Sequence, residues 1–296
     1  MKIILFSRAR APHSADEVRR IFDAMDRYGF DFAVNEEFAP ELTALTGRTI
    51  AAQSVYGAQV GVQPSEAIMV CYGGDGTLLE GAHRLRGAAI PVVGINSGHL
   101  GFLTSTPTSE IDELFADIAA ANIRIEPRTV VEVAGDFAQT PDSVLALNEF
   151  SIQRHGAGMI AVETYVDDQM VATYRGDGVL LCTPTGSTAY SLSAGGPVVA
   201  PQCGCLVISP LAPHNLTMRP VVIPDTSCVR MCIRARQADA FVTLDDRIYP
   251  VREGAEFTIR RSAHPIFLAV PHNISFYDTL RNKMMWGVDI RGEMQE

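Results

Sequence analysis

The sequence predicts two domains, a parallel-sheet α/β domain at the N-terminus followed by an all-β, sandwich-like domain. Its 296 residues correspond to about two average domains. Over the first 125 residues, apolar strand-like runs alternate with amphipathic helical segments, and this alternation indicates βαβ units. After about residue 126, short strand-like runs follow one another between Gly, Pro and Asp residues, a pattern typical of a β-sandwich.

The α/β domain begins with an apolar run and an amphipathic helix. Apolar residues recur at helical spacing over 14–28, where Ser14 and Glu17 form a capping box and Gly29 ends the helix. Further helices are expected at 77–85 and 109–121, and strands at 2–7, 30–34, 67–72 and 91–95. Together these elements predict a Rossmann-like parallel sheet.

The β domain is expected to consist of short strands joined by turns. The strand-like runs lie at 129–133, 144–153, 159–166, 170–174, 179–182, 205–209, 221–223, 229–235, 240–244 and 257–260. A final helix is expected at 276–286 and should pack back on the α/β part. We therefore predict that 1–125 and 274–296 form one domain and that 126–273 form the other.

Composition and charge restrict the class of protein. Thirty-four acidic and 24 basic residues give a net charge of −10, which argues against a nucleic-acid partner. The same charge requires a phosphorylated ligand to be neutralised locally by metal, backbone N–H groups or arginines. No apolar run reaches the length of a membrane span, and the run at 3–6 is too short for a signal peptide. With six cysteines and no secretory signal, we expect free thiols and a cytoplasmic location.

A glycine-rich turn, Gly73-Gly74-Asp75-Gly76-Thr77, lies between a buried strand and a helix. Glycines let the backbone approach a phosphate closely, and a helix N-terminus offers N–H donors and a positive dipole end. Asp75 would repel a phosphate, but it suits a metal ion or a proton leaving an attacking hydroxyl. A helix cap or a hairpin turn is the alternative interpretation.

Two further segments carry polar groups at strand ends. The loop 94–102, with glycines at 94, 98 and 101, follows the next strand, and ligands of open α/β sheets bind at such ends. Ordinary turn glycines explain this loop equally well, and His99 is most simply a solvated residue. Asn148 and Glu149 interrupt a strand-like run, and an amide beside a carboxylate suits ribose hydroxyls and an adenine edge.

The block from Tyr174 to Pro197 is the densest in polar groups. It contains seven hydroxyl side chains between 183 and 193, flanked by apolar and glycine-rich sequence. Neutral hydroxyls and backbone amides can bind a nucleotide without adding charge, and Tyr190 could stack on a ring. A serine nucleophile is an alternative, although no Gly-x-Ser-x-Gly elbow is present. Cysteines at 203, 205, 228 and 232 do not have the spacing of familiar zinc modules and are better explained as buried small side chains.

Taken together, these blocks resemble the NAD kinase family. The resemblance runs through 73–77, 94–103, Asn148-Glu149 and 177–197, more weakly through 213–220, and ends on the closing helix near Gly287. It implies transfer of the γ-phosphoryl of ATP to the adenosine-ribose 2′-hydroxyl of NAD, with a divalent metal, expected to be Mg²⁺. It also implies an α/β domain, a β domain, an active site between them, and a homodimer or homotetramer.

The resemblance also implies roles for single residues. Asp75 would accept the 2′-hydroxyl proton, and Gly73, Gly74, Gly76 and Thr77 would face the ATP phosphates. The residues expected to bind NAD are Asp75, Gly76, Asn148, Glu149, Arg175, Asp177, Thr188, Ala189, Tyr190, Ser191, Leu192, Ser193 and Ala212. Near 244–247 many family members carry Asp-Gly-Gln or Asp-Ser-Gln, whereas this chain has Arg247, whose role in binding is therefore in doubt. The residues do not identify the metal ligands.

Two other functions fit parts of the pattern. A kinase of lipid or sugar alcohols would share the Gly-Gly-Asp-Gly turn but would not need the block at 174–197 in this form. A non-catalytic sensor of dinucleotides would bind without turnover, and Asp75 would then be dispensable.

Overall fold

The computed structural model describes residues 1–8, 13–57, 66–98, 101–139, 141, 143–234, 240–251 and 254–287. The chain separates into two compact units, Met1–Pro127 with Phe267–Glu296, and Arg128–Ile266. Each unit has its own hydrophobic core. In the described part of the chain, no helix combines the length and the apolar character that a membrane crossing requires.

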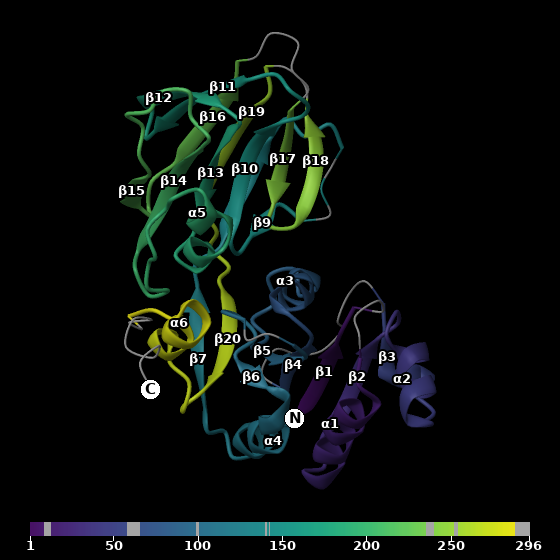
Figure 1. The fold of residues 1–296 in the computed structure, drawn as a ribbon. Coiled ribbons are helices and arrows are strands. Elements are labelled where there is room, and N and C mark those ends of the chain that lie inside the picture. The colour runs from purple at the N-terminus through teal and green to yellow at the C-terminus, as the bar shows by residue number, and fades with distance from the viewer. Residues whose placement is uncertain are drawn as a thin grey trace. The chain divides into compact units, whose positions relative to one another are not determined.

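The first unit is built on an eight-stranded sheet in the order β3-β2-β1-β4-β5-β20-β7, with β6 paired to β5 (Figure 1). Neighbouring strands from β3 to β20 run parallel, as the alternating pattern predicts. The strands are β1 (Lys2–Phe6), β2 (Asp31–Asn35), β3 (Val55–Tyr56), β4 (Ala67–Tyr72), β5 (Val92–Asn96), β6 (Thr106–Pro107), β7 (Ile123–Arg128) and β20 (Ile266–Pro271).

The helices of this unit are α1 (Ala15–Arg27), α2 (Ala39–Thr46), α3 (Asp75–Arg84), α4 (Ile111–Ala119) and α6 (Phe276–Met284). At the start of α1 the Ser14 hydroxyl accepts from the Glu17 N–H at 3.4 Å, which is the first half of the expected capping box. In the second half, the Tyr72 hydroxyl bridges the Ser14 N–H and the Glu17 carboxylate: it accepts from the N–H group and donates to the carboxylate. The start of α1 is thereby tied to the end of β4.

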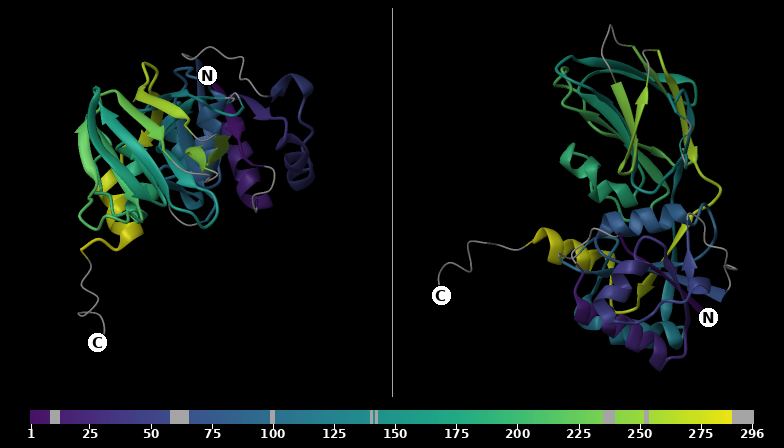
Figure 2. Two further views of the ribbon diagram at one scale, coloured as in Figure 1. Left: turned by 90° about the horizontal axis from the view of Figure 1, so that it is seen from above. Right: turned by 90° about the vertical axis from the view of Figure 1, so that its right-hand side faces the viewer.

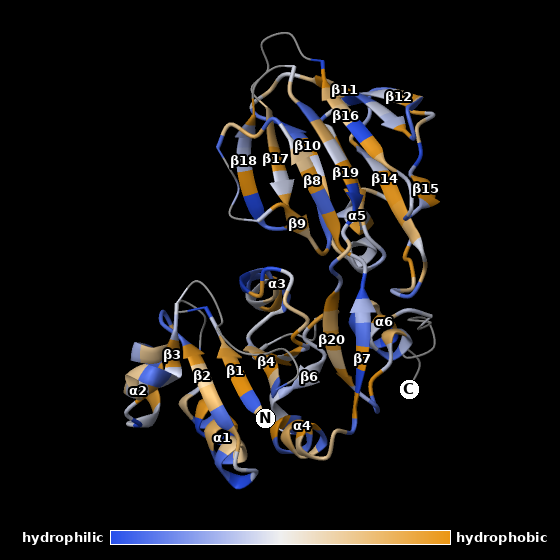
Figure 3. Cartoon of the chain, turned by 180° about the vertical axis from the view of Figure 1, so that it is seen from behind, coloured by the Kyte–Doolittle hydropathy of each residue, from blue (hydrophilic) through white to orange (hydrophobic). Residues whose placement is uncertain are grey.

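The chain returns to the first unit with a strand, β20, which pairs in parallel with β5. Residues 267–273 therefore belong to the α/β unit, which corrects the predicted boundary at 273. The run Ile-Phe-Leu-Ala-Val is apolar along its length (Figure 3). Composition cannot distinguish such a run from a strand in the core of a sandwich.

The second unit consists of two antiparallel six-stranded sheets that enclose one core, as the sequence predicts (Figure 2). One sheet has the order β15-β14-β13-β10-β17-β18, with β15 (Val221–Pro224), β14 (Cys205–Leu211), β13 (Gly178–Cys182), β10 (Glu149–Arg154), β17 (Ala240–Leu244) and β18 (Arg247–Val251). The other has the order β12-β11-β16-β19-β8-β9, with β12 (Gln169–Gly176), β11 (Ile160–Val166), β16 (Val229–Ile233), β19 (Glu256–Arg261), β8 (Val131–Gly135) and β9 (Leu145–Ala146).

Two local differences from the sequence prediction concern the functional residues. The strand expected over 144–153 is broken, because β9 and β10 lie in different sheets and Leu147-Asn148 connects them. The hydroxyl-rich block folds after β13 into a short 3₁₀ turn, Thr185–Thr188, and the one-turn helix α5 (Tyr190–Ser193). Both segments thus begin at the same end of the sheet that contains β10 and β13.

Candidate active site

The order of strands in the first sheet indicates a candidate ligand site at the carboxyl ends of β1 and β4. From β1 the chain proceeds to β2 and β3 on one side, whereas β4 and β5 lie on the other side. Ligands of open α/β sheets bind outside the carboxyl ends of the strands where the order reverses. The Gly73–Thr77 turn follows β4 at this point, and Ser7 and Arg8 follow β1.

Asp75 is the first residue of α3, and its carboxylate is bound by the loop that follows β5. The Phe102 N–H donates to Oδ2 at 2.9 Å. The Leu103 and Thr104 N–H groups donate to Oδ1 at 3.1 and 2.9 Å, and the Thr104 hydroxyl adds a fourth bond at 2.9 Å. Three consecutive amides around one carboxylate form an anion nest. The loop expected to line the ligand site therefore fixes the orientation of Asp75.

The glycines of this loop are required by close contacts. A Cβ added to Gly101 would lie 1.9 Å from Asp75 Oδ1, and one added to Gly94 would lie 2.5 Å from Thr104 Cγ2. The Asn96 amide also donates to the Thr104 carbonyl and hydroxyl, at 3.2 and 3.0 Å. The loop is thus shaped to hold Asp75. His99 and Leu100 lie outside the described residues.

Substituting Gly101 by alanine is expected to displace the Asp75 carboxylate, because no side chain fits at 1.9 Å. Forced packing of this kind costs about 1–3 kcal/mol of folding stability. We expect Gly101→Ala to lower kcat at least tenfold while Gly98→Ala, whose Cβ meets nothing within 4 Å, changes it little. Steady-state kinetics and thermal melts of both variants check this. Equal activity of the two variants would show that the nest does not hold Asp75 for catalysis.

Lys283 of α6 adds a cation that the sequence did not indicate as a site residue. Its Nζ lies 3.8 Å from Asp75 Oδ2 and 4.7 Å from the centre of the Phe102 ring. Oδ1 thus receives three donors, whereas Oδ2 receives one amide and faces the ammonium group. Oδ2 is therefore the oxygen with remaining capacity to accept a proton.

The peptide before the glycine turn is held from both sides. The Ser7 hydroxyl donates to the Tyr72 carbonyl at 2.5 Å, and the Gly73 N–H donates to the Ile95 carbonyl at 2.9 Å. Gly73 has a φ of 149°, and its missing Cβ leaves space for the Thr77 hydroxyl. Strands β1 and β5 therefore fix the conformation of the turn at its first residue.

In the second unit, Asn148 ends the connection between β9 and β10, Glu149 is the first residue of β10, and both are buried. Burial, and to a smaller extent the charge of Asp245, raises the pKa of Glu149 to about 8, while the Tyr190 N–H opposes the shift. Glu149 Oε2 has no hydrogen-bond partner among the described residues. A buried carboxyl oxygen in this condition is costly unless a ligand binds it.

The hydroxyl-rich block divides into internal and accessible groups. Four of the seven hydroxyl residues are buried, at positions 183, 185, 187 and 191. Thr183 Oγ1 donates to the Leu147 carbonyl at 2.5 Å, and the fully buried Ser191 hydroxyl lies 3.3 Å from that of Ser209. Ser191, which the sequence places among the NAD-binding residues, thus has its side chain turned into the protein. Thr188, Tyr190 and Ser193 retain accessible surface.

Gly186 joins the two segments of this site. The Thr183 N–H donates to the Asn148 carbonyl at 2.9 Å, and a Cβ on Gly186 would lie 2.0 Å from the same oxygen. The residues that the sequence proposed separately, Asn148-Glu149 and the block after Thr183, therefore form one cluster.

Arg175, Asp177 and Ala212 lie toward the other end of β13 from Glu149, and Tyr190 extends toward that end, because its hydroxyl donates to Gln153 Oε1 at 3.5 Å. Glu149 pairs with Cys182, whereas Gly178, next to Asp177, pairs with Gln153 and Leu211. Four residues of strand separate the two positions, which corresponds to about 13 Å. The Asp177 carboxylate is paired with Arg154 Nε at 2.6 Å. The sequence-predicted residues of this unit thus occupy both ends of β13.

The doubtful Arg247 contacts backbone carbonyls. Its Nη1 donates to the Ser143 carbonyl at 3.0 Å, and Nη2 donates to that of Leu145. Its guanidinium is thus engaged by the segment that precedes Asn148.

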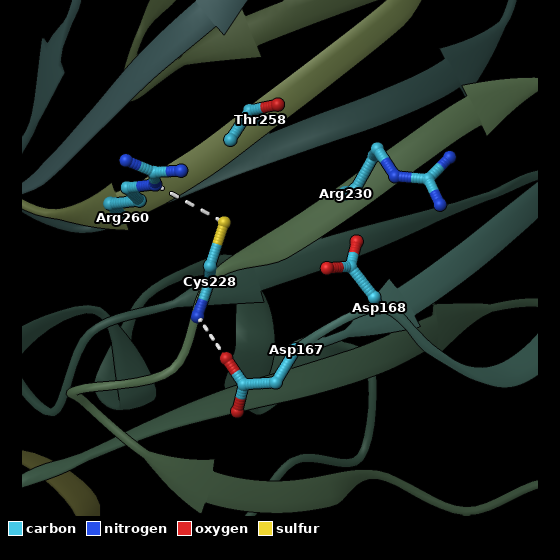
Figure 4. A pocket seen from close by; sticks show the side chains of 6 residues that line it. All are labelled: Asp167, Asp168, Cys228, Arg230, Thr258 and Arg260. Carbon is cyan, nitrogen blue, oxygen red and sulfur yellow. Dashed lines mark hydrogen bonds between the residues drawn. The ribbon is translucent and has the colours of Figure 1, made fainter.

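A pocket of about 330 Å³ on the second unit contains none of the expected site residues (Figure 4). It is lined by Asp167, Asp168, Cys228, Arg230, Thr258 and Arg260. The Asp167-Asp168 turn has positive φ at both residues and joins β11 to β12, as expected of a tight hairpin. The two aspartates and two arginines that line the pocket balance each other in charge, and the pocket is not part of the candidate site.

Comparison with known proteins gives consistent matches over most of the chain. The family models described as ATP-NAD kinase N-terminal domain and ATP-NAD kinase C-terminal domain match residues 3–123 and 147–270. The NAD kinase of Bacteroides fragilis is 33% identical over 292 residues, covering 98% of this chain and 100% of the relative. That of Porphyromonas gingivalis is 39% identical over 224 residues, covering 75% and 77%.

Two solved structures are also similar. The structure of an NAD kinase from Archaeoglobus fulgidus in complex with ATP superposes with a TM-score of 0.74 at 28% identity, covering 96% of this chain and 99% of that one. The yeast NADH kinase complexed with NADH gives a TM-score of 0.83 at 22% identity, covering 98% and 89%, and shows the same fold.

Proposed function

This chain belongs to the ATP-NAD kinase family and is a kinase that converts NAD to NADP with ATP, and we propose that Asp75 is its proton acceptor. The observation that supports this role is the carboxylate held by three amides and a hydroxyl at the carboxyl edge of the sheet. In the proposed step the 2′-hydroxyl proton passes to Asp75 Oδ2 as the ribose oxygen bonds to the γ-phosphorus. The bond from that phosphorus to the bridging oxygen breaks, and ADP leaves with its electron pair.

We propose that the glycine turn binds the phosphates of ATP through a subset of its amides. The Gly73 and Thr77 N–H groups already donate to the carbonyls of Ile95 and Gly74. The amides of 74–76, at the N-terminus of α3, are then the donors for phosphate. Gly73 and Thr77, expected from the sequence to face the phosphates, would instead shape the turn.

We propose that a divalent metal ion, Mg²⁺, arrives with ATP. Among the described residues no three His, Cys, Asp or Glu side chains gather as metal ligands. Mg²⁺ in nucleotide sites keeps several waters and is bound largely by phosphate oxygens, so an ion carried by ATP does not require a cluster of protein carboxylates. When bound, the ion neutralises phosphate charge.

Metal removal is therefore expected to stop NADP formation without unfolding the protein. Because the described residues contain no cluster of His, Cys, Asp or Glu side chains that could hold a structural ion, a chelator should leave the melting temperature within about 1 °C in the absence of ATP. Added Mg²⁺ should restore the rate. A large fall in melting temperature on chelation would indicate a resident structural metal and would contradict this proposal.

We propose that the second unit binds the adenosine part of NAD through Asn148 and Glu149, with Thr188, Ala189, Tyr190, Leu192 and Ser193 beside them. The support is the buried carboxyl oxygen of Glu149, which no described residue hydrogen-bonds, and the accessible surface of Thr188, Tyr190 and Ser193. Arg175, Asp177, Gly76 and Ala212 would contact other parts of the dinucleotide. Ser191 would brace the site from within.

We propose that the protein is a homodimer or homotetramer and that it is cytoplasmic, as its sequence and its family resemblance imply. Light scattering coupled to size-exclusion chromatography tests the first, and fractionation of the source cells tests the second. A monomer at micromolar concentration would overturn the assembly proposal.

The experiment that tests the activity offers several acceptors to the purified protein with radiolabelled ATP and Mg²⁺. NAD is expected to take the label and yield NADP, as read by an NADP-specific dehydrogenase. Diacylglycerol and sugar alcohols, the acceptors of other kinases with this turn, should remain unlabelled. Binding of NAD without any labelled product would instead support a sensor.

A further inference from the structure

The hairpin turn between β17 and β18 contacts the NAD-binding segment with two opposite charges. Asp245, which follows β17, is buried. The segment that it contacts lies about 97 residues earlier in the sequence. Its Oδ1 accepts from the Asn148 and Glu149 N–H groups at 2.7 and 3.1 Å, and its Oδ2 accepts from the Leu147 N–H at 2.9 Å. In return, the Asp245 N–H donates to the Glu149 carbonyl at 2.9 Å.

Arg247, which begins β18, contacts the same segment on its other side. Its guanidinium donates to the Ser143 and Leu145 carbonyls. The turn thus accepts from three amides with a carboxylate and donates to two carbonyls with a guanidinium. Residues 143–149 are held at both ends while they pass from one sheet to the other.

These contacts replace the pairing that a regular strand would provide. Because β9 belongs to one sheet and β10 to the other, the backbone groups of Leu147 and Asn148 cannot all find strand partners. A charged acceptor for three consecutive amides binds more strongly than neutral groups and fixes their direction. The Asp245 carboxylate therefore fixes the backbone positions from which the Asn148 and Glu149 side chains extend.

We propose that Asp245 and Arg247 are positioning residues for NAD, acting through the backbone of 143–149 rather than by contact with the substrate. The inference rests on the proposed binding of NAD by Asn148 and Glu149. It also accounts for arginine at 247, since a guanidinium supplies separate N–H groups to the two carbonyls.

The test compares Asp245→Asn with Asp246→Asn, which makes the same change of charge one residue along the same turn at an exposed position. An asparagine side chain has only one acceptor oxygen, so its NH₂ group would face a backbone N–H, that of Leu147 or that of Asn148. We expect the KM for NAD to rise about tenfold or more in Asp245→Asn, with kcat and the KM for ATP within about twofold of wild type. Asp246→Asn should match wild type in all three.

A second variant, Arg247→Met, keeps most of the apolar stem and removes the donors to the two carbonyls, so it decides the matter if Asp245→Asn does not fold. Its KM for NAD should rise several-fold at constant KM for ATP. Hydrogen exchange at the backbone amides of 147–149 should be faster in Asp245→Asn than in wild type and unchanged in Asp246→Asn. If the KM for NAD is unchanged in both variants, or if all kinetic constants deteriorate together, the positioning role is wrong. If wild type itself forms no NADP, the proposed function fails instead.

Discussion

Asp75→Asn is expected to lower kcat for NADP formation by about 10²–10⁴-fold, the contribution of a positioned general base. The amide keeps the size of the carboxylate but cannot take the proton from the ribose hydroxyl. It also places an NH₂ group against the Phe102 N–H or the donors to Oδ1, which all require an acceptor. We therefore expect a moderate loss of folding stability in addition to the loss of rate.

The matched control is Asp16→Asn, the same substitution in the same unit at a side chain that is 87% exposed. Steady-state kinetics of both variants at saturating NAD and ATP give the comparison. Asp16→Asn should retain the wild-type kcat. A rate for Asp75→Asn within a few-fold of the control would exclude Asp75 as the proton acceptor.

Glu149→Gln is expected to stabilise the protein above pH 8 and to have little effect near pH 5. The folded protein raises the pKa of Glu149 from 4.5 to about 8, so the folded state holds a proton that the unfolded state has lost between these values. In that window, stability falls as pH rises, because charging the buried carboxyl opposes folding. Glutamine carries no such charge and avoids the loss.

The expected gain is on the order of a few kcal/mol at pH 8.5, which is roughly 5 °C or more in melting temperature for a protein of this size. Thermal melts at pH 5, 7 and 8.5 measure it. Glu132→Gln, the same substitution at an exposed position on β8, should show no pH-dependent gain. A constant difference between Glu149→Gln and wild type at all three pH values would disprove the assignment of the raised pKa.

This stability cost supports a functional reason for Glu149. Above pH 8 we expect glutamine to be the more stable residue at this position, whereas the carboxyl retains an oxygen that has no hydrogen-bond partner in the described part of the chain. Proteins keep such groups mainly where a ligand or a reaction uses them. We also expect Glu149→Gln to bind NAD more weakly than wild type, which would link the two observations.

Much of the fold could be predicted from local patterns. The parallel sheet follows from apolar runs that alternate with helices, and the position of the glycine turn follows from the rule that ligands bind at strand ends. The capping residues of α1 were equally readable, although the role of Tyr72 in that cap was not. Strand β20 was missed because a short apolar run carries no information about which sheet it joins.

The site could be predicted in its residue types but not in its contacts. Asp75 was identified from its turn, yet the three amides that hold it come from residues 102–104, which the sequence indicates only as a glycine loop. Asp245 is a stronger case, since its partners lie almost one hundred residues earlier and antiparallel pairing brings them together. For Ser191 the sequence does not show that the side chain is buried beside Ser209, because hydroxyl density alone does not reveal which side chains turn inward.

A single-turnover experiment tests the central claim most directly, because protein in excess over NAD removes differences in binding and isolates the chemical step. Wild type and Asp75→Asn would each be mixed with a limiting amount of NAD and saturating Mg²⁺-ATP, and NADP would be quantified over time. We predict that wild type converts the bound NAD completely and that Asp75→Asn does so at least about 100-fold more slowly, although it binds the same NAD. Equal single-turnover rates would contradict the account, since the phosphoryl transfer would then proceed without the Asp75 carboxylate.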